Sequence, residues 1–510
     1  MGTRSIFAGL TRGVPGVGPR EMAPPASSFE DPDNIAAAAS LRYEAGKLFL
    51  GVIGASIERD AGTQERYAQD GTEIGVTDDR HVVTIAGTRA GKGRAAIIPN
   101  MLRYPGSVLA IDPKGELALE TAAVRAKKLG QRVCVLDPFN TTGGALKAFY
   151  SGFNPVALMR PDSLIEDAGL IADALVLATG GTDPHWDESA RSFIEGVILE
   201  VATAERFEGR RNLVTMRDLI AQGEEFELDD EDSDSESETE KGLRVLGAQM
   251  QESSLGAVRR AAADFFDKPE RERGSVLSSA RRHLRALAFP EIEESLKGEG
   301  LDLADLKKGK VTVYLCLPGR HMGTCGRWLR LFVNLALQAM ERTPGRPAAG
   351  CPVLFVLDEF ASLGHMRQIE DAAGQIAGYG VKLWPILQDL GQLKSLYQER
   401  WETFMGNAGI LQFFGNNDLT TLEWISKRLG TTTIQQLSSS QLTPGAKQAG
   451  ATGESYAPHT TAVLEPDEIA LVFGRADAKL RQLVIRAGFA PMILQRAYYD
   501  KHEAFTGSRP

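Results

Sequence analysis

The sequence predicts an α/β fold in which a doubly wound, mostly parallel β-sheet carries an inserted all-α domain. Seven apolar runs of strand length alternate with segments of helical periodicity, which is typical of repeated strand and helix units. The runs are apolar throughout, as expected for strands buried on both faces. A long stretch between the third and fourth runs shows helical periodicity alone. The seven runs span His81–Ala86, Ser107–Asp112, Val133–Asp137, Val311–Leu317, Val353–Asp358, Val381–Leu387 and Ile410–Phe414.

The chain around these strands is predicted to divide into three parts. Residues 1–34 are rich in Gly, Pro and Ser, and we expect a flexible leader there. Residues 35–153 and 306–510 carry the strands and are expected to form one discontinuous domain. Residues 154–305 place apolar residues at helical spacing and are expected to form the inserted all-helical domain.

Two segments are predicted to lack a packed structure. Residues 224–240 carry eleven acidic residues and no basic one, so they cannot bury enough apolar surface to offset the entropy of ordering. We expect a disordered loop there, either inert or a docking site for a basic partner. The stretch Ser438–Pro458 is rich in Ser, Thr, Gly, Gln and Ala, and a mobile loop is predicted.

Bulk composition excludes few classes of protein. The net charge is -10, but the chain without its acidic segment carries a net charge of about +1, so nucleic acid remains an acceptable partner. Four cysteines without CxxC spacing suggest buried free thiols in a reducing compartment. No signal peptide and no apolar run of membrane-spanning length is visible. We therefore expect a cytoplasmic protein without a transmembrane segment.

A glycine-rich turn between the first strand and a helix is the strongest motif. Such a turn points backbone N–H groups and the positive end of a helix dipole at one place, which suits a triphosphate. Lys92 would reach the outer phosphates, although Ala86 and Gly93 depart from the GxxxxGK[ST] pattern. The alternative interpretation is an ordinary structural turn. The candidate nucleotide-binding residues are Gly87, Thr88, Arg89, Ala90, Gly91, Lys92, Gly93 and Arg94.

Two further strands end in polar residues that could complete the site for ATP. The run VLFVL is followed by Asp358, which could hold Mg²⁺, and by Glu359, which could polarise the attacking water. The run VKLWPIL is followed by Gln388, which could sense the γ-phosphate, although polar residues at strand ends are common. The predicted catalytic residues are Lys92, Glu359 and Gln388, and the fold is then a RecA-like P-loop NTPase.

Several segments together give a specific resemblance. In order they are GTRAGKG with IIPNML, SVLAIDPKGE, FNPV, VLFVLDEFASLGHM, IAGYGVKLWPILQDLGQLKSLY, LQFFGNND, ISKRLG and LEPDEIALV. In sequence and order they resemble the type IV coupling protein family of TraG-like conjugative transfer ATPases. A GKG ending of the phosphate loop is common in that family.

The resemblance implies a function and a set of partners. It implies a DNA-dependent ATPase that recruits relaxase-bound DNA and drives its transfer through a type IV secretion system. The implied partners are DNA, the relaxase or another secretion substrate, the ATPases of the secretion channel and inner-membrane components. The implied assembly is a homo-hexamer, which forms either on DNA or before DNA binds. The resemblance also implies a peripheral location at the inner membrane. Family members usually begin with transmembrane helices. We therefore expect either a separate membrane anchor or a soluble ATPase that is recruited to the channel or to another DNA-moving machine.

Alternative functions and residues stay open at this stage. A soluble ring translocase for DNA processing or defence would share the same motor, and a non-hydrolysing adaptor would need no water-activating acid. The chain has only seven histidines, and they do not show the spacing of metal ligands. This disfavours a relaxase or a nuclease. A ring ATPase needs an arginine from a neighbouring subunit. Four arginines are candidates for that role, namely Arg327, Arg367, Arg400 and Arg428.

Overall fold

A large mixed sheet forms the centre of the molecule in a computed structural model, which describes residues 27–176, 185–224, 237–439 and 454–508. The sheet has eleven strands in the order β4-β1-β15-β14-β11-β5-β10-β9-β6-β8-β7. The predicted strands pair in parallel over the whole stretch from β11 to β7. This confirms the predicted fold class. Their bounds are β5 (His81–Ala86), β6 (Val108–Ile111), β7 (Arg132–Leu136), β8 (Val311–Leu315), β9 (Val353–Leu357), β10 (Val381–Leu387) and β11 (Ala408–Phe414).

Four antiparallel strands that the sequence analysis did not name extend the sheet beyond β11. Strand β14 pairs with β11, and β15, β1 and β4 follow in turn. They join segments from the two ends of the chain, because β1 and β4 precede the phosphate loop and β14 and β15 lie near the C-terminus. Their bounds are β1 (Leu48–Ile53), β4 (Thr72–Val76), β14 (Arg481–Arg486) and β15 (Met492–Gln495).

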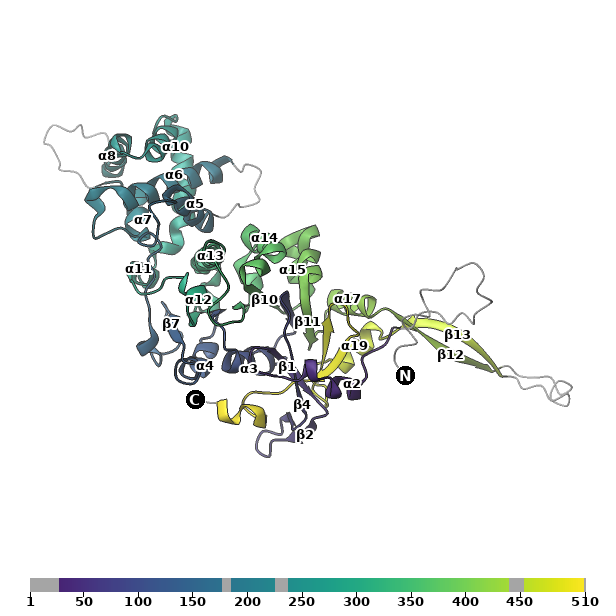
Figure 1. Cartoon of the computed structure of the whole chain (residues 1–510). Helices are drawn as coiled ribbons and strands as arrows, with labels where there is room; N and C mark the ends of the chain where they lie inside the picture. The colour runs from purple at the N-terminus through teal and green to yellow at the C-terminus, as the bar shows by residue number, and fades with distance from the viewer. Residues whose placement is uncertain (1–26, 177–184, 225–236, 440–453, 509–510) are drawn as a thin grey trace, which may run out of the picture.

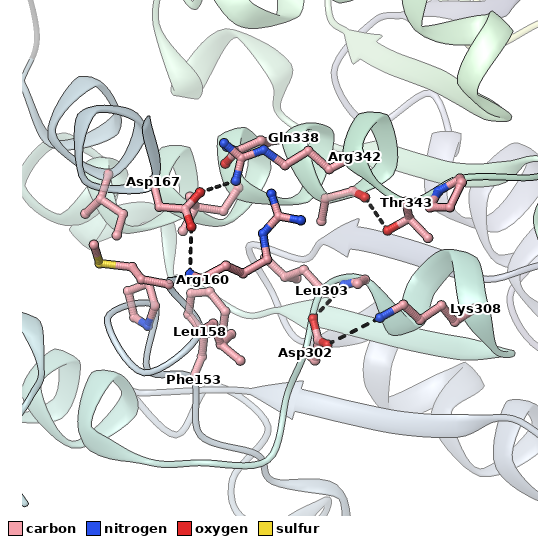
Figure 2. A pocket seen from close by; sticks show the side chains of 17 residues that line it. Phe153, Leu158, Arg160, Asp167, Asp302, Leu303, Lys308, Gln338, Arg342 and Thr343 are labelled. Atoms are coloured by element: carbon pink, nitrogen blue, oxygen red, sulfur yellow. Dashed lines mark hydrogen bonds and ion pairs between the residues drawn. The ribbon is translucent and has the colours of Figure 1, made fainter. Parts of the chain in front are cut away.

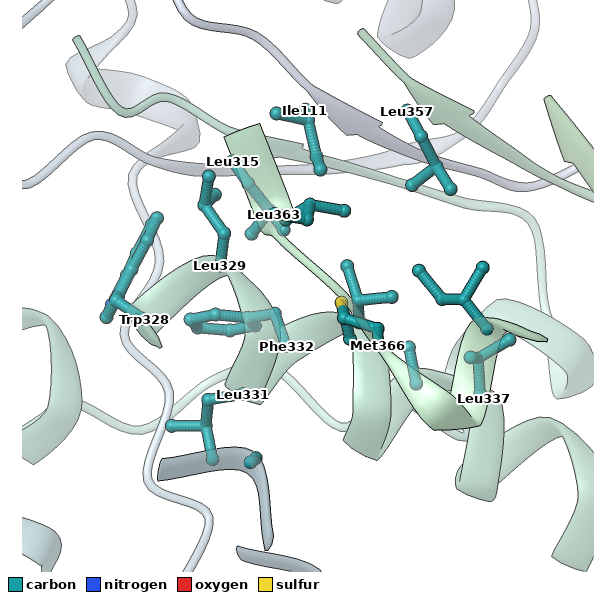
Figure 3. Packing of buried hydrophobic residues seen from close by; sticks show 14 of the residues in the cluster. Ile111, Leu315, Trp328, Leu329, Leu331, Phe332, Leu337, Leu357, Leu363 and Met366 are labelled. Carbon is teal, nitrogen blue, oxygen red and sulfur yellow. The ribbon is translucent and has the colours of Figure 1, made fainter. Parts of the chain in front are cut away.

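Helices cover both faces of the parallel strands. Helices α3 (Ile98–Arg103) and α4 (Glu116–Lys127) pack with strand residues such as Val356 in one apolar cluster. Helix α13 (Gly319–Arg342) packs against the opposite face, where Phe332 is fully buried below Leu357 (Figure 3). The other helices on this side and at the β11 end are α14 (Arg367–Gln375), α15 (Leu390–Tyr397), α16 (Trp401–Asn407), α17 (Leu419–Leu429) and α19 (Pro466–Val472).

The described chain between β7 and β8 forms helices joined by turns and irregular segments, with isolated bridges at Tyr150 and Gly152. Figure 1 shows α5 to α10 as a group set apart from the sheet, with α11, α12 and α13 between them. The domain boundaries at residues 154 and 305 stay a prediction. The helices are α5 (Leu164–Leu175), α6 (His185–Thr203), α7 (Leu213–Gln222), α8 (Glu238–Glu252), α9 (Gly256–Phe266), α10 (Glu270–Leu284), α11 (Pro290–Lys297) and α12 (Asp305–Lys308).

The predicted disordered acidic loop is wrong at both of its ends. Glu224 is buried and pairs with Arg206 and Arg210, because a buried carboxylate needs cationic partners. At the other end Ser237 caps helix α8 in a reciprocal pair with Glu240. Residues 225–236 lie outside the described part of the chain.

The predicted mobile loop from Ser438 to Pro458 is likewise wrong at its edges. Strands β12 (Thr431–Ser439) and β13 (Glu454–Ala462) pair over nine positions and form a ribbon that projects from the body (Figure 1). The ladder begins at Thr431 and its neighbours up to Ile434, favourable strand residues outside the predicted loop, and continues into both edges of that loop. Residues 440–453 lie outside the described part.

The predicted flexible leader extends too far. Residues 1–26 are not described, but the Ser27 amide donates to the Thr431 carbonyl at 3.0 Å. Helix α2 (Pro32–Ala37) then begins with Asp31 as its capping residue. The chain is therefore attached to the body before residue 35. All four cysteines are free thiols, as expected. Within the described residues, no helix is both long and apolar enough to cross a bilayer.

Candidate nucleotide-binding site

The glycine-rich turn leaves β5 at the carboxyl edge of the parallel strands and enters a helix directly. Its chain reverses at two residues with positive φ, Arg89 at 57° and Gly91 at 89°. The turn closes through a hydrogen bond from the Ala90 amide to the Gly87 carbonyl at 3.1 Å. The π-helical turn η2 (Gly93–Ile97) and α3 follow at once. Free N–H groups at such a helix start form an anion site.

Gly87 is required by the neighbouring strand rather than by its own backbone angles. A Cβ atom at this position would lie 1.9 Å from the carbonyl oxygen of Gly415, just beyond β11. The Gly87 amide also donates to the Phe414 carbonyl at 3.1 Å. The turn is thus pressed against β11, which fixes its position on the sheet.

The Lys92 side chain lies between the two acids that follow β9. Its Nζ atom is 3.2 Å from Asp358 Oδ1 and 3.1 Å from Glu359 Oε1. Burial lowers the pKa of Lys92, but the two carboxylates outweigh it and the net pKa is raised. Burial raises the pKa of Asp358 and outweighs the opposing effect of Lys92. Lys92 therefore compensates both carboxylates.

Glu359 and Gln388 join three strands across the site. Glu359 has a left-handed backbone with φ of 54°, which turns the chain sharply after Asp358. The Gln388 amide nitrogen donates to Glu359 Oε2 at 3.2 Å, and its amide oxygen accepts from the Thr88 hydroxyl at 2.9 Å. Gln388 thereby connects the phosphate loop to Glu359, in the position of a group that can relay a change on one side to the other.

Asp112 is a buried carboxylate close enough to Asp358 to interact with it electrostatically, and the sequence did not single it out. It follows β6, the strand next to β9, and is 1% exposed. Burial raises its pKa to about 6, although the Ala118 amide donates to it at 2.8 Å and favours the charged form. Its signal was present in the segment IDPKGE, where an acid ends an apolar strand.

Arg94 has a different role from the other residues of the loop. Its guanidinium contacts Glu65 at 2.5 Å and Asp500 at 2.6 Å, and it stacks 4.4 Å from the centre of the Tyr498 ring. Its side chain therefore ties the loop to the hairpin of β2 (Ser56–Arg59) and β3 (Arg66–Gln69) and to the C-terminal segment. The main chain of Arg94 remains part of the turn that follows the phosphate loop.

Arg496 also supports the loop, and nothing in the sequence pointed to it. It is fully buried and donates to the Ala90 carbonyl at 3.0 Å. The same guanidinium donates to the carbonyls of Leu480 and Gly474. A buried guanidinium that donates to three carbonyl groups fixes the backbone around it, so Arg496 is a positioning residue.

A cavity of about 1150 Å³ lies at this site, although Gly87, Asp112, Asp358 and Arg496 do not contribute to its lining. Thr88 to Arg94, Glu359 and Gln388 line one side, and the β2–β3 hairpin with Tyr498 to Asp500 lines the other. Lys114 and Glu116, considered only weakly from the sequence, also line it. The cavity combines phosphate-binding amides, a lysine and carboxylates, which is the chemistry that a Mg²⁺-bound nucleotide needs. No cluster of three or more potential metal ligands occurs among the described residues.

Several other arginines of the sequence analysis have structural partners. Arg400 pairs with buried Glu370 at 2.5 Å, whereas Arg367 is 84% exposed and only 3.8 Å from Asp371. The Arg327 guanidinium donates to the Arg282 carbonyl at 3.4 Å. The contacts within one subunit therefore favour none of these arginines for the role in a neighbouring active site.

The chain is similar to proteins of conjugative DNA transfer. A family model described as "Type IV secretory system Conjugative DNA transfer" matches residues 35–509. The conjugal transfer protein TraG of Escherichia coli is 28% identical over 403 residues, which cover 76% of this chain and 61% of TraG. Protein VirD4 of Rhizobium radiobacter is 27% identical over 82% of this chain and 57% of VirD4. The chain thus spans about three fifths of the length of these curated relatives.

Solved structures agree with the fold. The bacterial conjugative coupling protein TrwBdeltaN70, in its unbound form, superposes with a TM-score of 0.62 at 15% identity and covers 95% of this chain and 96% of its own. Plasmid coupling protein TrwB in complex with the non-hydrolysable ATP analogue ADPNP gives a TM-score of 0.61 at 16% identity. TrwB has also been solved in complex with ADP and Mg²⁺.

Proposed function

The chain belongs to the family of type IV secretory system conjugative DNA transfer proteins, and we propose that it is a DNA-dependent ATPase that acts as a coupling protein in conjugation. The observation that carries this proposal is the placement of Lys92 between Asp358 and Glu359, at 3.2 and 3.1 Å, directly below the phosphate loop. An adaptor that only binds nucleotide needs no second carboxylate beside the lysine.

The cavity fits ATP with Mg²⁺, as in the complexes described for TrwB. The main-chain N–H groups of the loop other than those of Gly87 and Ala90, which donate to carbonyl groups, would bind the phosphates. Asp358 would hold the magnesium shell. A bound Mg²⁺ neutralises phosphate charge and orients the terminal phosphate. Because Lys92 is shared by two carboxylates, its transfer to the phosphates would release Glu359.

The released Glu359 would act as the general base that orients and polarises the attacking water. Gln388 donates to the Glu359 carboxylate and accepts from Thr88, so loss of the γ-phosphate at the loop would change the hydrogen bonds of Glu359. This linkage gives Gln388 the role of a sensor that reports hydrolysis to the rest of β10. Helix α15 begins soon after β10 and would carry the change outwards.

Family membership supports a set of partners that we also propose. The substrate is DNA bound to a relaxase, or another secretion substrate, and the machinery comprises secretion-channel ATPases and inner-membrane components. The working assembly is a homo-hexamer at the inner membrane, held there by an anchor and assembled on DNA or before it. Residues 154–305 form a separate all-helical domain in this proposal.

The proposal is tested by measuring ATP hydrolysis by the purified full chain with and without single- and double-stranded DNA. We expect turnover that requires Mg²⁺, is lost on addition of EDTA and rises with DNA. Tight nucleotide binding without turnover under every DNA condition, at protein concentrations that allow rings to form, would instead favour the adaptor. ATP turnover that is the same with and without DNA would contradict the proposal of a DNA-dependent motor, but it would support ATPase activity.

Gly93 offers a prediction of the metal dependence. A Cβ atom there would meet no atom within 4 Å, so a side chain fits. Gly93→Ser places a hydroxyl where many phosphate loops hold Mg²⁺, and should lower the Mg²⁺ concentration for half-maximal turnover by about threefold to tenfold. The measurement is a magnesium titration of ATP hydrolysis, with Gly93→Ala as the control that adds a Cβ without a ligand. Equal curves for both variants would contradict the prediction.

A further inference from the structure

A second cavity, of about 320 Å³, lies where the chain passes between the helical segment and the sheet (Figure 2). One wall is the segment Phe153–Arg160, which leads from the sheet towards α5. Another is Asp302–Lys308, which leads back to β8. The C-terminal half of α13 and one side of α5 complete the lining. No residue of the candidate nucleotide site lines this cavity.

The lining of this junction cavity is largely apolar. Phe153 and Ile171 are each 1% exposed and Leu303 is 3% exposed, so they form a fixed floor. Leu158 lies at the edge of the cavity and keeps 41% of its surface exposed. A cavity of this size with an apolar floor and an open edge has the features of a small-molecule site.

The charges around the cavity leave one cation without a counter-ion. Arg342 forms ion pairs with Asp167 and with Glu166, and the latter contact is 2.6 Å. Lys308 lies 4.0 Å from Asp302. In the part of the chain that the structure covers, no carboxylate lies within ion-pair distance of the Arg160 guanidinium. Arg160 contacts Asp167 through its main-chain N–H alone, which donates to the Asp167 carboxylate.

The Arg160 side chain reaches into the cavity itself. Figure 2 shows its guanidinium between α13, with Gln338 and Arg342, and the segment that carries Leu303. A guanidinium beside apolar walls presents two parallel N–H donors to a planar anion. The apolar floor and Arg160 line the same cavity, so one bound molecule can make both an ionic contact and hydrocarbon contacts.

We propose that the junction cavity binds a small amphipathic monocarboxylate. Its carboxylate pairs with Arg160, and its hydrocarbon chain lies against Phe153, Ile171 and Leu303. A single negative charge matches the single unpaired cation, and the apolar lining excludes a highly charged phosphate compound. Because both segments that connect the helical part to the sheet line the cavity, an occupant also holds these segments together. This inference does not depend on the proposed ATPase activity.

The test is calorimetric titration of the full chain with sodium octanoate, with octanamide and acetate as comparison ligands. We expect one octanoate per chain, and binding of octanamide or acetate weaker by on the order of tenfold or more, because each lacks one half of the recognition. Arg160→Leu should weaken octanoate binding by on the order of tenfold or more. Exposed Arg260 lies outside the cavity, and Arg260→Leu should leave binding unchanged.

A filling variant tests the location of the site independently. Ala339 is half-buried and lines the cavity, so Ala339→Phe should displace the hydrocarbon chain and abolish octanoate binding. Thermal melting of each variant shows whether it folds, and octanoate should raise the melting temperature of the wild type and of Arg260→Leu only. Equal binding of octanamide and octanoate, unchanged binding by Arg160→Leu or Ala339→Phe, or no binding to the wild type would each overturn the proposal.

Discussion

Replacing Glu359 with glutamine should lower the rate of ATP hydrolysis by about two to four orders of magnitude and leave nucleotide affinity nearly unchanged. Glutamine keeps the size of the side chain but cannot accept a proton from the attacking water. Lys92 would still have Asp358 at 3.2 Å as a partner, so the phosphate loop should keep its conformation. The measurement compares the turnover number with the dissociation constant of a fluorescent ATP analogue for the same variant.

A matched control is available within the same cavity. Glu116 lines the cavity at the start of α4. Glu116→Gln removes a comparable charge from the cavity and should leave turnover within about threefold of the wild type. If Glu359→Gln keeps wild-type turnover, or if both variants lose it equally, then Glu359 is not the base and the mechanism proposed for the site is wrong.

The sequence predicted the parallel half of the sheet well and the antiparallel half poorly, for a physical reason. Strands such as β9 are buried on both faces and therefore appear as uninterrupted apolar runs. Strand β14 has a partly exposed arginine at each end, and β15 is four residues long. Such short strands with charged ends lack a continuous apolar pattern, and the pairing of β15 with β1 joins segments from opposite ends of the chain.

The sequence likewise predicted some features of the candidate site and not others. Lys92, Asp358, Glu359 and Gln388 all follow predicted strands, and parallel strands bring their carboxyl ends to one edge, so the sequence placed them together in advance. The structure brings these four side chains into contact. Their catalytic roles remain proposals. Burial, which raises the pKa of Asp358, could not be read from the motif alone.

The supporting residues could not be predicted because their partners are distant in the chain. The Arg94 guanidinium is bound by Glu65 and Asp500, and Arg496 binds the Ala90 carbonyl. None of these contacts has a characteristic spacing. The composition arguments failed for a related reason, because Glu224 and β12 are ordered by pairing with other segments rather than by their local sequence.

Replacing Lys92 with alanine should weaken ATP binding by on the order of 100-fold or more and abolish measurable turnover. The charge-assisted contacts that the Lys92 ammonium would make to the phosphates are lost, each worth about 1.5 to 3 kcal/mol. The change also leaves Asp358 and Glu359 without their shared cation, so two carboxylates would face the incoming phosphates. The variant is therefore expected to fail at binding, whereas Glu359→Gln is expected to fail at the chemical step.

Comparison with two further variants separates charge from position. Lys114 lines the same cavity without contacting either acid, so Lys114→Ala should reduce affinity by about threefold at most. Lys92→Arg keeps the charge, but a planar guanidinium cannot occupy the point between Asp358, Glu359 and the phosphates, so it should recover part of the binding and little turnover. Equilibrium binding and turnover for all three variants decide the matter. Wild-type affinity in Lys92→Ala would mean that the nucleotide binds elsewhere, because no phosphate could lie at the glycine-rich turn without contacting this side chain.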